Sequence, residues 1–339
     1  MRSKTSLLLT ITLLLSLLFN LTACGKETLT ESSFMMDTVI TYNITADDAE
    51  ALIDDCNCMI TELENRLSAH IETSEVSIFN YSASLNLSSD TKEVASLALD
   101  IYKNTNGAFD ITVAPLVSLW NIAHGKDGWT PPSSDDVDAL LPFIGSDKLT
   151  LTGDTLSKST VDIKIDLGGI AKGYALGACA EYLSEKDAVG TLSFGGSIAV
   201  IGRKSNGDPW NIGIKDPSSP DKLCGEVSLE SGVISVSGGY ERYREHDGIR
   251  YHHILDPKTG HPSSSDLACA VVICPSAAPL SGALCDALST ALFVMGKDAS
   301  LSLYDTGIYG FEAILITNDG SVTVTEGLEG RFTLYESEA

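Results

Sequence analysis

The 339-residue sequence predicts an α+β fold. Two kinds of segment support this prediction: amphipathic stretches with the three- and four-residue spacing of helices, and short alternating runs separated by glycine and proline turns. The two kinds do not alternate regularly, as they would in a parallel sheet built from βαβ units. The chain also shows no internal repeat.

Four helices follow from apolar periodicity. The first runs about five turns from Ala49, and the second covers about Thr91–Asn104. The third begins near Ile170. The fourth spans about Gly282–Met295, and Gly296 ends it because glycine favours the backbone that follows a helix.

Short alternating runs predict strands. The tail is expected to form a hairpin around Asn318-Asp319-Gly320. An alternating run, "VDIKIDL" (161–167), predicts a strand directly before the third helix. The other predicted strands are TLSFGG (191–196), IAVIG (198–202), WNIGI (210–214), VISVSGG (233–239), YHHIL (251–255) and ACAVVIC (268–274).

The N-terminus has the features of a secretory signal. Two basic residues precede an apolar run from Leu7 to Phe19, which ends in "LTAC" at Cys24. This ending resembles a bacterial lipobox, so residues 1–23 are expected to be removed and Cys24 to be lipidated; a plain signal peptide is the alternative. Residues 24–33 would then form a polar tether and 34–339 the folded domain. The protein would be exported and held by its lipid on the outer face of the cytoplasmic membrane.

The net charge of −24 limits the partners. Such a surface repels nucleic acid, so no nucleic-acid partner is expected. A polyanionic ligand would need local cations or a metal. The cysteines other than Cys24 form no CxxC pair and have no zinc-like spacing, which argues against a disulfide framework or a thiol nucleophile.

Three motifs could carry chemistry. In "DLGGIAKGYALG" (166–177), glycines lie between a predicted strand and a helix, where free N–H groups attract anions; a tight structural turn is the alternative. On the fourth helix, Asp286 and Thr290 lie one turn apart and could offer oxygen ligands to Mg²⁺, although such pairs also occur by chance. In "YHHILDPKTGHP", His252 and His253 lie on opposite faces of a strand. One of them should face inward, where it could accept a proton or merely hydrogen-bond a turn.

With their neighbours, these motifs resemble the ApbE-type FAD:protein FMN transferases. The similarity covers nearly the whole chain after the signal. It rests on MDTVITY (36–42), LSAHIETSEVSIFN (67–80), GAFDITVAPLVSLWNI (107–122), DLGGIAKGYA (166–175), LSFGGSIAVIGRKSNGDPWNIGIKDP (192–217), SVSGGYERY (235–243), HILDPKTGHP (253–262) and CDALSTALFVMG (285–296).

The resemblance implies a mixed helix and sheet fold with FAD in a cleft between two subdomains. It also implies Mg²⁺-dependent transfer of the FMN moiety of FAD to a threonine or serine of an acceptor protein, with AMP leaving. The acceptor would be a membrane redox subunit or an extracytoplasmic flavoprotein with a flavinylation motif.

Site residues can be carried over by position. The resemblance assigns His253 as the base and Gly169, Asp286 and Thr290 as the Mg²⁺ ligands. It implies flavin contacts at Met36, His70, Asp110, Ile111, Thr112, Asp166, Lys172 and Leu255.

Two positions depart from the family pattern. Asp37 replaces the glycine of the usual "MGT", and His70 stands where tyrosine is common. The identity of the second position bears on whether such a protein transfers FMN, hydrolyses FAD to FMN and AMP, or only holds flavin. A pyrophosphatase and a non-catalytic flavin-binding lipoprotein are therefore the alternatives.

Overall fold

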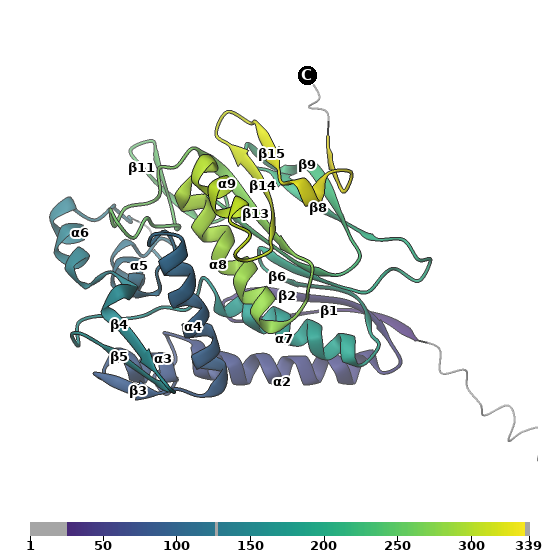
Figure 1. Ribbon diagram of the computed structural model, residues 1–339, viewed down its shortest axis with the longest axis horizontal. Coiled ribbons are helices and arrows are strands. Elements are labelled where there is room, and N and C mark those ends of the chain that lie inside the picture. Colours follow the sequence, from purple (N-terminus) through teal and green to yellow (C-terminus); the bar gives the residue numbers. More distant parts are fainter. Residues whose placement is uncertain (1–25, 126–127, 336–339) are drawn as a thin grey trace, which may run out of the picture.

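One antiparallel sheet of eight strands organises the protein. The computed structural model describes residues 26–125 and 128–335 (Figure 1), so the predicted signal peptide and Cys24 lie outside the described residues. The spatial order is β1-β2-β6-β7-β10-β13-β14-β15. These strands are β1 (Glu27–Met35), β2 (Thr38–Ala46), β6 (Val189–Phe194), β7 (Ser197–Ile201), β10 (Gly232–Gly238), β13 (Leu267–Cys274), β14 (Glu312–Thr317) and β15 (Val322–Val324). The observed mixture of helices and sheets confirms the predicted α+β class.

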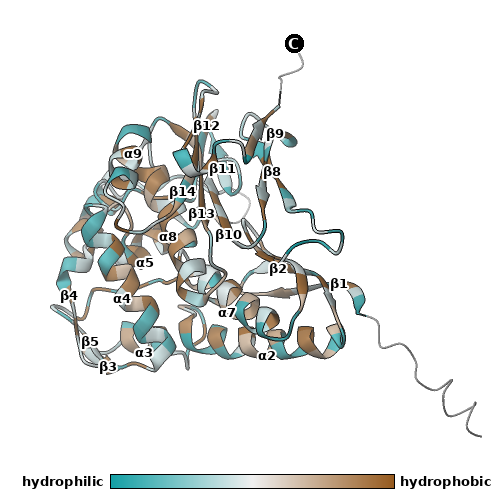
Figure 2. Ribbon diagram, turned by 45° about the vertical axis from the view of Figure 1, so that its right-hand side comes forward, coloured by the Kyte–Doolittle hydropathy of each residue, from teal (hydrophilic) through white to brown (hydrophobic). Residues whose placement is uncertain are grey.

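The central strands of this sheet are buried on both faces. Alternate side chains point to opposite faces of a strand, so Val272 joins one apolar cluster and Val271 another. Helices α2 (Ala49–Leu67), α7 (Ala171–Glu185) and α8 (Pro279–Met295) cover the first face. A three-stranded sheet of β8 (Trp210–Asp216), β9 (Ser219–Leu229) and β16 (Phe332–Leu334) covers the second. Figure 2 shows α8 mostly hydrophobic, as its burial requires.

The remaining elements surround this core. Helix α4 (Ser89–Asn104) packs against α8, and a third apolar cluster forms around Trp120. The other elements are α3 (Glu75–Asn80), β3 (Ser84–Asn86), α5 (Ala114–Trp120), α6 (Ser134–Leu140), β4 (Leu149–Thr152), β5 (Thr155–Lys158), β11 (Tyr243–His246), β12 (Ile249–His252), α9 (Lys297–Asp305) and the 3₁₀ turns η1 (Ile111–Val113), η2 (Leu141–Phe143), η3 (Ser146–Lys148) and η4 (Glu326–Leu328). None of the described helices has the length and apolar character needed to cross a membrane.

Most elements appear where the sequence predicts them. All four predicted helices are present, and the hairpin around Asn318-Asp319-Gly320 joins β14 to β15. Helix α8 starts three residues before its predicted beginning, at Pro279, because proline suits the first helical position.

The predicted tether is wrong for most of its length. Residues 27–33 belong to β1, which pairs with β2 along its whole length, from Glu27 opposite Ala46 to Met35 opposite Thr38. The side chains of β1 are mostly polar and exposed because β1 is an edge strand. The side chains of β1 therefore lack the apolar alternation that predicts a strand. They pair with β2 through hydroxyl groups instead, such as those of Ser32 and Thr41, which lie 3.0 Å apart.

The strand predicted at 161–167 is also wrong. Its apolar side chains Ile163, Ile165 and Leu167 are buried in alternation, but the segment joins no ladder. The side chain of Asn80 replaces the missing strand: its Oδ1 accepts from the Ile165 N–H at 2.7 Å, and its Nδ2 donates to the Ile165 carbonyl at 2.9 Å. An extended segment thus remains satisfied without a neighbouring strand.

Candidate functional site

The glycine turn before α7 is held by its own polar groups. Oδ1 of Asp166 accepts from the Gly168 N–H at 2.6 Å, so this carboxylate orients the turn. The Asp166 N–H in turn donates to the carbonyl of Ile111 at 2.7 Å. Lys172, in the first turn of α7, folds back and donates from Nζ to the Gly168 carbonyl. That contact offsets the unfavourable position of a cation at a helix N-terminus.

The two later glycines of this motif serve helix packing. A Cβ at Gly173 would lie 2.2 Å from the Gly282 carbonyl oxygen, and one at Gly177 would lie 2.3 Å from the Ala278 carbonyl oxygen. Helices α7 and α8 therefore approach so closely that only glycine fits. The close approach also lets the Gly173 N–H donate to Oδ2 of Asp286 at 2.9 Å. Thus the motif is both a structural turn and one wall of a polar site.

Replacing Gly177 with alanine is expected to destabilise the fold. The added methyl meets backbone atoms that cannot rotate away, so α7 and α8 must separate, at a cost of about 1–3 kcal/mol. Urea unfolding should show the loss. Ala178→Ser, on the half-buried side of the same helix, serves as the control. Equal stability of Gly177→Ala and wild type would contradict the packing role.

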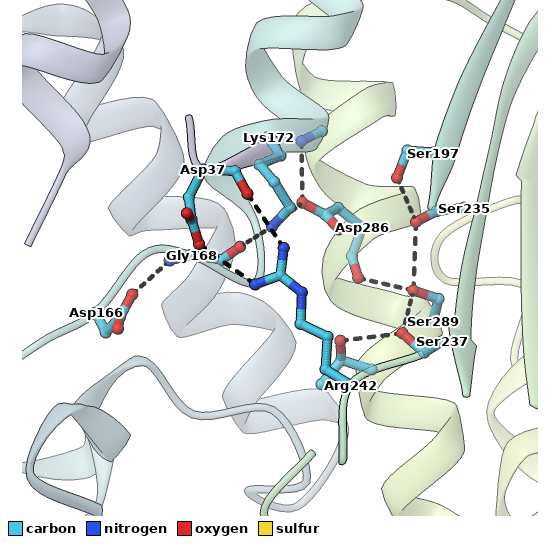
Figure 3. A network of polar contacts seen from close by, with 12 residues as sticks. Asp37, Asp166, Gly168, Lys172, Ser197, Ser235, Ser237, Arg242, Asp286 and Ser289 are labelled. Atoms are coloured by element: carbon cyan, nitrogen blue, oxygen red, sulfur yellow. Dashed lines mark hydrogen bonds and ion pairs between the residues drawn. The ribbon is translucent and has the colours of Figure 1, made fainter. Parts of the chain in front are cut away.

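Asp286 is the central carboxylate of the site. Its residue is only 8% exposed, and its Oδ2 lies 3.9 Å from Nζ of Lys172 (Figure 3). Its Oδ1 has no hydrogen bond to any described residue. One turn later, Oγ1 of Thr290 lies 3.3 Å from Oγ of Ser237, and Ser237 also contacts Ser289 at 2.8 Å. Asp286 and Thr290 therefore share a face of α8, as predicted, and the Ser237 hydroxyl of β10 contacts the Thr290 end of that face.

The side chains of Asp286 and Thr290 have the chemistry of magnesium ligands. Asp286 offers an oxygen without another partner among the described residues, and the Thr290 hydroxyl follows one turn later on the same helix. Within 26–125 and 128–335, no cluster of three or more histidine, cysteine or acidic side chains could hold a metal. A single carboxylate with neutral oxygens suits Mg²⁺, which keeps waters and substrate phosphate in its coordination shell.

His253 follows directly on β12 and is positioned by backbone contacts. The carbonyl of Arg242 accepts from the His253 N–H at 3.0 Å, and Nδ1 of the ring lies 3.2 Å from the same oxygen. Nδ1 must therefore carry the proton, and Nε2 keeps its lone pair. His253 is an exposed residue, yet the protein around its ring lowers its pKa to about 4, mainly by desolvation, despite the hydrogen bond to Arg242. The charges of Arg242 and Lys172 also lower this pKa.

His252 is the inward-facing histidine, and of the two alternatives that the sequence left open it takes the second, a hydrogen bond to a turn. Its Nε2 lies 2.9 Å from the Ser263 carbonyl, its ring packs edge-on against Phe293, and burial lowers its pKa. Its Nδ1 is buried and has no hydrogen-bond partner in the described structure. His252 is therefore structural, and the ring that can reach a reacting group is His253.

The β1–β2 turn brings further groups to this region. Met36 and Asp37 both have positive φ, 51° and 56°. Asp37 contacts Arg242, with Oδ2 3.5 Å from Nη1 and the carbonyl 3.2 Å from Nη2, and its Oδ2 lies 3.7 Å from Nε2 of His124. The rings of His124 and His70 meet edge to face at 6.3 Å between centroids. Met36 thus lies in the same turn as Asp37, and His70 is connected to this turn through His124.

Other predicted flavin contacts have buried side chains. Asp110 is 5% exposed, and it accepts hydrogen bonds from the N–H groups and hydroxyls of Thr112 and Ser146. Ile111 and Leu255 pack in apolar clusters. Burial raises the pKa of Asp110, and its four hydrogen bonds act in the opposite direction. The contact of these side chains with flavin therefore remains a prediction.

The sequence interpretation missed three contributors: Arg242, Ser237 and His124. Arg242 and Ser237 lie within the quoted segment "SVSGGYERY", but nothing in their spacing announces a role. The only signal in the sequence was Asp37. An acidic residue in place of a glycine indicates that a cationic side chain lies nearby.

The chain resembles known proteins over most of its length. Residues 36–315 match the family model described as "ApbE family". The chain is similar to the FAD:protein FMN transferase of Haemophilus influenzae, with 31% identity covering 90% of this chain and 92% of that protein. The corresponding protein of Vibrio cholerae is 32% identical over 80% of this chain and 82% of its own. Among solved structures, the ApbE protein of Thermotoga maritima gives a TM-score of 0.81 with 29% identity, covering 90% of this chain and 99% of that one.

Proposed function

This chain belongs to the ApbE family, and we propose that it is a FAD:protein FMN transferase. It moves the FMN moiety of FAD onto a threonine or serine of an acceptor protein and releases AMP. The observation that carries the proposal is a histidine with a free Nε2, held by the backbone of Arg242, together with a turn that pairs Lys172 with Asp286. A base and an anion-binding wall are what transfer of a phosphoryl-linked group to a hydroxyl requires.

His253 acts as the general base. Its Nε2 accepts the proton of the acceptor hydroxyl as the hydroxyl oxygen forms a bond to the phosphorus of FMN. The P–O bond to AMP breaks, and AMP leaves with the electron pair. A pKa of about 4 keeps this ring neutral, and therefore able to accept a proton, at neutral pH.

Lys172 and the glycine turn receive the pyrophosphate of FAD. Lys172 is half-buried, and its ammonium group supplies positive charge in a chain whose net charge is −24. Asp286, Thr290 and the carbonyl of Gly169 would hold Mg²⁺. When bound, Mg²⁺ supplies Lewis-acid stabilisation of the charge on the phosphoryl oxygens. Met36, His70 and Asp166 would contact the flavin half.

The test is incubation of purified protein with FAD, Mg²⁺ and an acceptor domain that carries a flavinylation motif. In-gel flavin fluorescence on the acceptor, with one AMP formed per flavin attached, is the expected result. Free FMN with an unlabelled acceptor would instead identify an FAD pyrophosphatase. Unchanged FAD would identify a flavin-binding protein without catalysis.

The acceptor is proposed to be an extracytoplasmic flavoprotein or a subunit of a membrane redox complex. This proposal rests on the signal sequence and on Cys24, which would place the enzyme on the outer face of the cytoplasmic membrane through its lipid. Because β1 begins at Glu27, only residues 24–26 would separate the lipid from the folded domain. The catalytic domain would then lie close to the membrane surface.

Replacing Cys24 with serine is expected to release the protein from the membrane. Metabolic labelling with a radioactive fatty acid should mark the wild type and the control Cys58→Ser, which changes an exposed cysteine of α2. The Cys24→Ser protein should carry no label. Labelling of that variant would refute lipidation at this position.

A further inference from the structure

Arg242 contributes two separate groups to the site. Its carbonyl fixes the tautomer of His253, whereas its guanidinium reaches Asp37 on the β1–β2 turn, beside the Gly168 turn (Figure 3). These contacts join parts of the chain 205 residues apart. Within the described structure the guanidinium makes no hydrogen bond or ion pair with His253 or Asp286, so the proposed mechanism gives it no role of its own.

The ion pair between Arg242 and Asp37 is weak enough for an anionic ligand to displace Asp37 from the guanidinium. The side chains are 44% and 56% exposed, and the charged atoms are 3.5 Å apart. Exposed pairs of this kind contribute little to stability because water screens them. A phosphate offers a guanidinium two parallel, charge-assisted hydrogen bonds and is therefore the stronger partner. Asp37 would retain His124 as a neighbour after losing Arg242, since its Oδ2 lies 3.7 Å from Nε2 of that ring.

We propose that Asp37 is an internal substitute for the substrate's phosphate: it holds the Arg242 guanidinium in the free protein and yields it to the pyrophosphate of FAD on binding. This inference rests on the proposed function. It makes Arg242 a substrate-binding residue and Asp37 a residue that lowers the affinity for the dinucleotide. The pair keeps an exposed cation in place near His253 until an anion arrives.

The decisive variants are Asp37→Asn and Arg242→Gln. Asparagine tolerates the positive φ of position 37 and keeps the shape of the side chain, so only the charge is lost. Two matched controls are available. Asp247→Asn removes a carboxylate from another positive-φ turn, where it pairs with His246 at 3.4 Å. Arg203→Gln removes a guanidinium from another exposed ion pair, the one with Glu230.

Binding should be measured by calorimetry with FAD, inorganic pyrophosphate and riboflavin, each in the presence of Mg²⁺. Asp37→Asn should bind FAD and pyrophosphate about 3-fold more tightly, as expected for loss of one exposed competing charge. Arg242→Gln should bind both about 10-fold or more weakly, the scale of a lost charged hydrogen bond. Riboflavin has no phosphate, so its affinity should not change. In the Arg242→Gln background, adding Asp37→Asn should not tighten the binding of FAD or pyrophosphate, because the guanidinium that Asp37→Asn would release is absent.

Two results would overturn the inference. An equal gain from Asp37→Asn in the Arg242→Gln background, or from Asp247→Asn, would mean that the effect is general electrostatics. Unchanged pyrophosphate affinity in Arg242→Gln would show that the guanidinium does not bind the substrate. Failure of the wild type to bind FAD would instead count against the proposed function. The pyrophosphate titrations would still show whether the Arg242 guanidinium leaves Asp37 for a phosphate.

Discussion

Asp286→Ala is expected to lose at least about 10³-fold of its FMN transfer activity, since metal-assisted stabilisation of phosphoryl charge contributes several kcal/mol to the transition state. The same carboxylate accepts from the Gly173 N–H at 2.9 Å, and it lies 3.9 Å from the Lys172 ammonium. Removing it therefore deprives the site of its only carboxylate ligand candidate on this face of α8 and leaves a buried N–H group without its partner. Initial rates measured across a Mg²⁺ titration check the prediction.

A second substitution separates chemistry from folding. Asp286→Asn keeps a side-chain oxygen for the Gly173 N–H but loses the charge, so it should melt within a few degrees of wild type and still be nearly inactive. Asp266→Asn is the control, because Asp266 accepts from the Lys297 N–H at 3.0 Å at the start of α9. Wild-type rates for Asp286→Asn at low Mg²⁺ would remove Asp286 from the metal site.

His253→Ala is expected to slow transfer by about 10² to 10⁴, the usual contribution of a general base, and to leave FAD affinity unchanged. The ring touches the Arg242 carbonyl but its Nε2 is directed to no described protein acceptor, so its loss disturbs little of the fold. Single-turnover rates and FAD titrations measure the two quantities separately. His246→Ala, on the exposed β11–β12 hairpin, is the control and should behave as wild type.

The pH profile gives a second readout for the same residue. A base must be deprotonated, and desolvation lowers the pKa of His253 to about 4. The rate should therefore stay level between about pH 5 and 7 and fall only as the pH drops through 4, whereas an unperturbed histidine would lose activity near 6.5. A limb near pH 6.5, or one that persists in His253→Ala, would assign the proton transfer to another group.

A good part of the site could be predicted because helical phase is a local property. Asp286 and Thr290 must share a face of α8 at 100° per residue wherever that helix lies. The turn at 166–170 is likewise local, since Asp166 is two residues from the N–H it accepts. The choice of His253 over His252 was carried by the family resemblance rather than by geometry, because strand alternation alone favours neither face.

Strand assignment was less reliable, and the cause is the same in both failures. Edge strand β1 shows polar side chains to solvent on either side of its ladder, so its composition is that of a tether. The segment at 161–167 has the alternation of a strand, but Asn80 satisfies its backbone instead. A segment forms a strand only if another segment pairs with it. The residues of the segment itself do not identify that partner.

The sequence by itself determined the α+β class, the four major helices and the residues that the family motifs identify. It also determined the net charge of −24, because of which any polyanionic ligand needs cations at its site. The tertiary structure alone decided which of these residues meet. It brought Gly173 against Gly282, so that Asp286 could accept a backbone N–H, and it brought Asp37 to Arg242 across 205 residues. The physical reason is that periodicity and turn chemistry act over a few residues, whereas close helix contact and ion pairing depend on how the sheet orders its strands and stacks α7 on α8.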